Sequence, residues 1–256
     1  MMSPDRSHWK VPAIWKDRTV VIIGGGPSVA QLDLDAVLGK PARDFRVLGC
    51  NDAYMLGDWV DLCYFGDYDW YHSTHRDDGR VHREVLLKEF KGEIVTCSKK
   101  LVLDDQVKQL RRIGNSLQNQ GARIGWFRNT GASAVNLALR MGAAKVVLVG
   151  FDMTCKEDPK ASEDERRKRV RLGTQNAKPM NRVQRYQYNK AKGLVANWHP
   201  NYKNYPKPDR LQNIFLPMFE RISVQVKTVF PEAEILNATE GSAIKCFPFV
   251  SLEEVL

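Results

Sequence analysis

A short, β-branched run stops abruptly at three glycines near the start of the chain. The run is Arg18-Thr-Val-Val-Ile-Ile23, and the turn after it is Gly24-Gly25-Gly26-Pro27-Ser28. Such a run is typical of a strand buried on both faces of a parallel sheet. Glycines at its end let backbone N–H groups approach an anion, and Ser28 can cap a helix that we expect through Val29–Leu38. The pattern predicts a turn that binds the phosphates of a nucleotide, with a plain strand-to-helix turn as the alternative.

Further apolar runs alternate with amphipathic stretches along the chain. We expect strands at Phe45–Gly49, Val60–Phe65, Glu93–Cys97, Arg123–Phe127 and Lys145–Gly150, and helices at Val81–Phe90, Leu103–Ile113, Gly131–Met141 and Asp209–Ile222. This alternation predicts an α/β fold with a doubly wound, mostly parallel, Rossmann-like sheet. Ligands of such sheets bind outside the carboxyl ends of the strands. Polar residues follow the expected strands there, namely Asn51, Asp52, Asp67, Asn129, Thr130 and Asp152.

A second loop repeats the logic of the glycine turn. In Arg128-Asn-Thr-Gly-Ala-Ser133, the side chains of Asn129 and Thr130 stand beside Gly131 at an expected helix start. We predict that Asn129-Thr130-Gly131 contacts phosphate, with ordinary capping of the helix as the alternative.

Positive charge is concentrated in one segment. Between Cys155 and Pro200 the chain has twelve Lys or Arg and five Asp or Glu, which places +7 of the formal charge of +9 there. We interpret residues 155–200 as a basic lid inserted into the nucleotide-binding domain. The predicted division is an N-terminal extension at 1–17, the α/β domain at 18–154, the lid at 155–200, and the completion of the same domain at 201–256. We expect acceptor contacts from Arg166, Arg167, Lys168, Arg169 and Tyr202, with DNA or another nucleic acid as one polyanionic acceptor and a merely solvated lid as the alternative.

Composition excludes several other classes of protein. No stretch approaches the roughly 18 apolar residues of a membrane span, and the first residues lack the apolar core of a signal peptide. We therefore expect a cytoplasmic protein. The five cysteines are widely spaced and form no C-x-x-C pair, which favours free thiols over disulfides or zinc.

Three segments resemble a known group of enzymes. GGGPSVAQLDL (24–34), LGCNDAY (48–54) and NTGASAVNLALRMGAAKVVLVGFDM (129–153) resemble the bacterial sialyltransferases that use CMP-sialic acid. The same order is similar to a wider group that includes flagellin-modifying transferases and the archaeal 6-hydroxymethylpterin diphosphokinase. The resemblance implies that Gly25 and Ser28 flank the nucleotide, that Asn51 bonds the base or ribose, and that Thr130-Gly131 holds phosphate.

The chain also departs from the sialyltransferase pattern. It has Gly66-Asp67 where those enzymes have an Asn, and Met153 and Thr154 where they have tyrosines. These departures argue against CMP-sialic acid itself as the donor.

Two residues are candidates for catalysis. His199 closes the basic segment, where the sialyltransferases place a catalytic histidine, and a histidine suits removal of a proton from an acceptor hydroxyl. A histidine packed on Trp198 is the alternative. Asp67-Tyr-Asp69 is similar to the D-x-D that holds a divalent metal on a sugar-nucleotide pyrophosphate, so Asp67 is a metal candidate, with a solvated turn as the alternative.

The leading hypothesis is a glycosyltransferase-like enzyme with a nucleotide-activated sugar as donor and His199 as base. The second is a magnesium-dependent diphosphokinase acting on a small alcohol, with the metal on Asp67. The third is a nucleic-acid-binding module with a vestigial nucleotide site.

Overall fold

The protein is built around one parallel sheet. A computed structural model describes residues 8–75, 81–154 and 210–256. Its main sheet has seven strands in the order β11-β10-β1-β2-β3-β6-β7, and every neighbouring pair is parallel. The strands are β1 (Thr19–Ile23), β2 (Phe45–Cys50), β3 (Leu62–Phe65), β6 (Glu93–Thr96), β7 (Val107–Gln109), β10 (Lys145–Val149) and β11 (Glu234–Asn237). The predicted α/β class with a mostly parallel sheet is confirmed.

Helices flank this sheet on both faces, and two small strand pairs stand beside it. The helical elements are η1 (Pro27–Gln31), α1 (Leu34–Leu38), η2 (Asn51–Leu56), α2 (Tyr68–Tyr71), α3 (Arg83–Leu87), α4 (Thr130–Arg140), η3 (Leu211–Phe215), α8 (Leu216–Val229) and α9 (Leu252–Val255). The small pairs are β4 (Thr74–His75) with β5 (Val81–His82), and β8 (Arg111–Ile113) with β9 (Arg123–Gly125).

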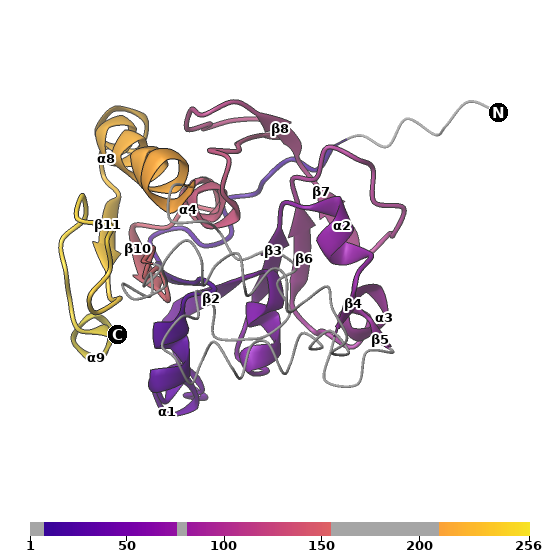
Figure 1. The fold of residues 1–256 in the computed structure, drawn as a ribbon, viewed down its shortest axis with the longest axis horizontal. Helices are drawn as coiled ribbons and strands as arrows, with labels where there is room; N and C mark the ends of the chain where they lie inside the picture. Colours follow the sequence, from indigo (N-terminus) through magenta and orange to yellow (C-terminus); the bar gives the residue numbers. More distant parts are fainter. Residues whose placement is uncertain (1–7, 76–80, 155–209) are drawn as a thin grey trace, which may run out of the picture.

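The alternation of side chains along the strands divides the core between the two faces. Val20 and Ile22 of β1 pack in a cluster with residues of α4 and α8, whereas Val21 and Ile23 pack with residues of α1, η2 and α9. Figure 1 shows α4 and α8 together on one side of the sheet and α1 on the other. Because successive side chains of a strand point to opposite faces, a continuous apolar run serves both clusters.

Two local predictions are wrong, and a third is right only in part. The expected single helix through Val29–Leu38 is two elements, because the chain leaves η1 at Leu32 in an extended conformation and Asp33 caps α1 by accepting a hydrogen bond from the amide of Ala36. The expected helix at Leu103–Ile113 is replaced by β7 and β8. Pairing of β7 with β6 decides this outcome, since the spacing of Leu103, Val107 and Leu110 suits a helix equally well.

The strand expected at Arg123–Phe127 is present as β9, but it is shorter than expected. β9 (Arg123–Gly125) pairs with β8 and lies outside the main sheet.

The described part of the N-terminal extension packs on the domain. Trp15 is buried, and the amide of Trp9 donates to the carbonyl of Gln109 at 2.8 Å. Within the described ranges, no helix is long and apolar enough to cross a membrane.

Candidate functional site

The order of the strands places a topological switch point between β1 and β10. From β1 the chain adds β2, β3, β6 and β7 on one side, and later β10 and β11 on the other. The next described helices after β1 and β10, α1 and α8, pack on opposite faces of the sheet, and ligands of open α/β sheets bind at such a switch point. The two loops that border it are Gly24–Ser28 after β1 and Gly150–Thr154 after β10.

Asp152 joins these two loops. Its carboxylate accepts hydrogen bonds from the backbone amide of Ser28 at 3.2 Å and from the Ser28 hydroxyl at 2.8 Å. The amide of Gly26 donates to the carbonyl of Gly150 at 2.8 Å, and a Cβ on Gly26 would overlap the Asp152 carboxylate. Sequence reasoning placed Gly24, Gly25, Gly26, Pro27, Ser28 and Asp152 in one site, and the structure brings the two loops together.

These contacts also change how the glycine turn is understood. The Ser28 amide already has an acceptor in Asp152, so the phosphate contact predicted for Ser28 stays a prediction. Burial raises the pKa of the Asp152 carboxyl, and the hydrogen bonds from Ser28 partly oppose that rise. The switch point thus holds a partly buried carboxylate, and a carboxylate can accept hydrogen bonds from ligand hydroxyl groups.

Backbone strain gathers around the same edge of the sheet. Among the described residues, the non-glycine residues with positive φ are Asp17, Asn51, Phe127, Arg128 and Met153. Asn51 directly follows β2, Met153 lies in the loop after β10, and Phe127 and Arg128 lead into α4. A left-handed conformation costs free energy in a non-glycine residue and is often found at functional sites.

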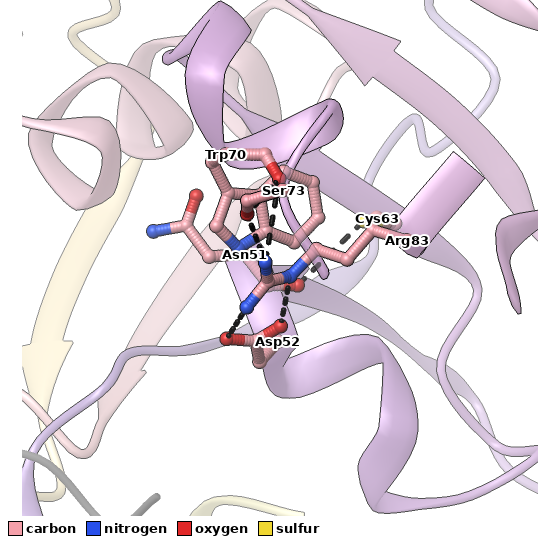
Figure 2. Close-up of polar contacts among 6 residues, drawn as sticks. All are labelled: Asn51, Asp52, Cys63, Trp70, Ser73 and Arg83. Atoms are coloured by element: carbon pink, nitrogen blue, oxygen red, sulfur yellow. Dashed lines mark hydrogen bonds and ion pairs between the residues drawn. The ribbon is translucent and has the colours of Figure 1, made fainter. Parts of the chain in front are cut away.

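Asp52 is part of a buried ion pair (Figure 2). Its two carboxylate oxygens accept hydrogen bonds from Nε and Nη2 of Arg83, at 2.7 and 3.0 Å, and both side chains are 1% exposed. The Arg83 guanidinium also lies 5.0 Å from the ring centroid of Trp70 and donates to the Ser73 hydroxyl. This arrangement gives Asp52 a structural role, and we leave it out of the proposed nucleotide site.

The loop before α4 is a helix cap as well as a candidate phosphate site. The Asn129 side chain accepts a hydrogen bond from the amide of Ala132 at 3.0 Å, which is the capping alternative. Thr130 is half-buried, and a Cβ on Gly131 would overlap the ring of Phe151, which follows β10. The start of α4 therefore lies beside the loop after β10, as expected if Asn129, Thr130 and Gly131 share a site with Asp152.

The remaining candidates have less structural support. Asp67 is exposed at the start of α2, and the described ranges contain no group of three His, Cys, Asp or Glu side chains that could hold a metal ion. A metal on Asp67 stays a prediction. His199, Arg166, Arg167, Lys168, Arg169 and Tyr202 lie outside the described residues.

Sequence reasoning missed two residues at this edge, Arg112 and Trp126. The Arg112 guanidinium stacks on the Trp126 ring, with 3.6 Å between its central carbon and the ring centroid, and donates to backbone carbonyls that follow β3 and β6. The sequence signal that could have found Arg112 is the absence of any Asp or Glu between Leu110 and Arg128, a stretch with four arginines.

Comparison with known proteins supports the fold. No protein-family model and no curated protein sequence matches the chain. The MAf glycosyltransferase from Magnetospirillum magneticum AMB-1 is a similar solved structure, with a TM-score of 0.53 and 16% sequence identity over 96% of this chain. The chain spans 35% of the length of that enzyme. At this level of identity the likeness establishes a shared fold.

Two sialyltransferases from Campylobacter jejuni were also found. CstII, solved with the substrate analogue cytidine-5'-monophosphate, has a TM-score of 0.45 and 13% identity, covering 93% of this chain and 87% of its own. The monofunctional alpha-2,3-sialyltransferase Cst-I has a TM-score of 0.42 and 14% identity, covering 93% of this chain and 82% of its own.

Proposed function

We propose that this chain is a glycosyltransferase-like enzyme that binds a nucleotide-activated sugar donor at the switch point between β1 and β10. The observation that carries the proposal is the convergence of the Gly24–Ser28 loop and the Gly150–Thr154 loop on the Asp152 carboxylate at the switch point of the sheet. Left-handed residues border the same edge. The MAf enzyme with which the chain shares its fold is a glycosyltransferase.

The proposal divides the work between the two sides of the site. Asn129-Thr130-Gly131, at the start of α4, binds the phosphate of the donor, because the backbone N–H groups and the dipole of a helix N-terminus favour negative charge there. The Asp152 carboxylate accepts hydrogen bonds from hydroxyl groups of the donor, and Asn51 lies near the base or ribose. We assign removal of the acceptor proton to His199 on the sequence pattern alone.

The first experiment is a thermal-shift screen of the full chain against nucleotides and sugar nucleotides, with and without Mg²⁺ or Mn²⁺. A ligand that binds only the native state at 100 times its Kd adds about 2.7 kcal/mol to the free energy of unfolding, so a specific donor gives a clear rise in Tm. Turnover then identifies the reaction. Free nucleotide released from a sugar nucleotide supports the proposal, whereas AMP formed from ATP and a small alcohol with Mg²⁺ would show a diphosphokinase.

A pair of variants locates the donor site. We expect Asp152→Asn to weaken the Kd of the donor found in the screen about tenfold, because a hydrogen bond to a charged acceptor is replaced by one to a neutral acceptor. Asp61→Asn is the matched control. Asp61 is another partly buried carboxylate, but it precedes β3 and so stands at the opposite end of the strands. Equal effects of the two substitutions would remove Asp152 from the donor site.

A further inference from the structure

Arg112 is fixed at the carboxyl edge of the sheet. Its Nε donates to the carbonyl of Cys97 at 2.7 Å, and its Nη2 donates to the carbonyl of Gly66. Cys97 directly follows β6 and Gly66 directly follows β3, so the guanidinium bridges the ends of two neighbouring strands. One face of the guanidinium lies against the Trp126 indole, with 3.6 Å between its central carbon and the ring centroid. The two carbonyls and the Trp126 ring thus hold the guanidinium in one orientation.

The positive charge of Arg112 is not neutralised by these contacts. Carbonyl oxygens accept its protons but carry no net charge, and no ion pair of Arg112 occurs within residues 8–75, 81–154 and 210–256. Its Nη1 makes no hydrogen bond in the same ranges. A fixed guanidinium with an uncommitted nitrogen suits a negatively charged ligand group.

Other groups converge on this position from different elements. A Cβ on Gly66 would overlap the Trp126 ring and would lie 3.2 Å from the Thr130 hydroxyl oxygen. Gly66 therefore allows β3, the β9–α4 connection and the guanidinium to approach closely. The hydroxyl of Thr130, the first residue of α4, therefore lies near Gly66, the residue whose carbonyl accepts a hydrogen bond from Arg112.

We propose that Arg112, supported by Trp126 and with Thr130 beside it, forms a subsite for a phosphate group of the nucleotide donor. The inference rests on the proposed function for the identity of the donor. The Nη1 N–H groups of Arg112 and the Thr130 hydroxyl donate to the phosphate oxygens. Trp126 limits the motion of the guanidinium, so that little side-chain entropy is lost on binding.

The test compares charged and uncharged ligands on matched variants. Calorimetric titrations of the full chain with cytidine, uridine, guanosine and adenosine 5'-diphosphates are each paired with a titration of the parent nucleoside. We expect Arg112→Gln to weaken diphosphate binding at least tenfold and to leave nucleoside binding unchanged. Arg111→Gln removes the same charge from the neighbouring exposed residue, and we expect it to change the diphosphate Kd less than threefold.

Further variants and a second probe keep the outcomes distinct. Arg112→Lys keeps the charge but loses the planar fork, and we expect an intermediate Kd; it also replaces Arg112→Gln if that variant does not fold. Equal weakening by Arg111→Gln, or equal loss of nucleoside binding in Arg112→Gln, would overturn the subsite. If the wild type binds no nucleotide, the proposed function fails. Inorganic pyrophosphate then tests the subsite alone, and pyrophosphate binding that is absent, or unchanged in Arg112→Gln, would overturn it.

Discussion

Asp52 follows β2 and Asp152 follows β10, so both lie at the carboxyl ends of strands in the same sheet, but their surroundings differ. Both carboxylate oxygens of Asp52 accept hydrogen bonds from the Arg83 guanidinium. Removing one partner of such a buried ion pair leaves an unpaired buried charge, which costs several kcal/mol of stability. Asp152 receives hydrogen bonds from Ser28, and burial raises its pKa. The sequence predicted both residues as polar groups at a strand end. It could not separate their roles, because Arg83 lies 31 positions from Asp52 and Ser28 lies 124 positions from Asp152.

The raised pKa of Asp152 gives a pH-dependent prediction. Because the native state binds this proton more readily than the unfolded state, the contribution of Asp152 to stability is fully present below its unfolded pKa of about 3.9 and is lost as the pH rises through the native pKa. Asp152→Asn does not titrate. We therefore expect the free energy of unfolding of wild type minus that of Asp152→Asn to fall as the pH rises above about 4 in urea titrations.

An opposite control is available in Glu253. The hydrogen bond from the Ser251 hydroxyl lowers the pKa of Glu253, so the wild type minus Glu253→Gln difference should rise with pH through the acid range. A difference for Asp152→Asn that is flat or rises with pH would contradict the assigned direction.

At the scale of elements, the local pattern of apolar residues predicts the central strands of the sheet but does not predict the edge strand β7 or the break between η1 and α1. Apart from one partly buried residue in each (Thr19, Arg46 and Lys145), β1, β2 and β10 are apolar and buried because both faces of the sheet are covered, and such runs can be recognised in the sequence. β7 has three residues, and only its pairing with β6 distinguishes it from a helical turn. The break between η1 and α1 depends on capping by Asp33, which a pattern of apolar spacing does not register.

The glycine turn gives a prediction at this scale. A Cβ on Gly26 would meet the Asp152 carboxylate and would lie 2.6 Å from the carbonyl oxygen of Gly150. We expect Gly26→Ala to lower the free energy of unfolding by about 1–3 kcal/mol, as overpacking does. Gly114→Ala is the control, because a Cβ there meets nothing within 4 Å and its effect should be within about 0.5 kcal/mol. Equal stability of the two variants in urea unfolding would show that the β1 and β10 loops are not in close contact.

At the scale of the whole molecule, charge is divided unevenly along the chain. Residues 155–200 carry +7 of the formal charge of +9, so the remainder is nearly neutral. The sequence reveals this division directly, since it depends on composition. What the basic residues contact depends on residues outside the described ranges, and the polyanionic acceptor stays a prediction.

A charge-removal experiment tests that prediction. If the basic segment binds nucleic acid, replacing Arg166, Arg167, Lys168 and Arg169 by Gln should weaken binding and flatten the slope of log affinity against log salt, by about 0.7–0.9 for each phosphate that the protein no longer neutralises. Fluorescence anisotropy with single- and double-stranded DNA over a salt series measures both quantities. A wild type that binds no DNA or RNA with salt dependence would leave the charge to a smaller phosphorylated acceptor or to solubility.

The position of β1 in the sheet has a consequence for the newly made chain. β1 is translated first among the sheet strands, and one of its two neighbours, β2, follows soon after. Its other neighbour, β10, begins more than a hundred residues after the end of β1 and is therefore translated much later. Until then one backbone edge of a strand with four fully buried residues in the native state stays open to other chains. The same delay applies to the proposed donor site, because Ser28 contacts Asp152 only after β10 has paired with β1.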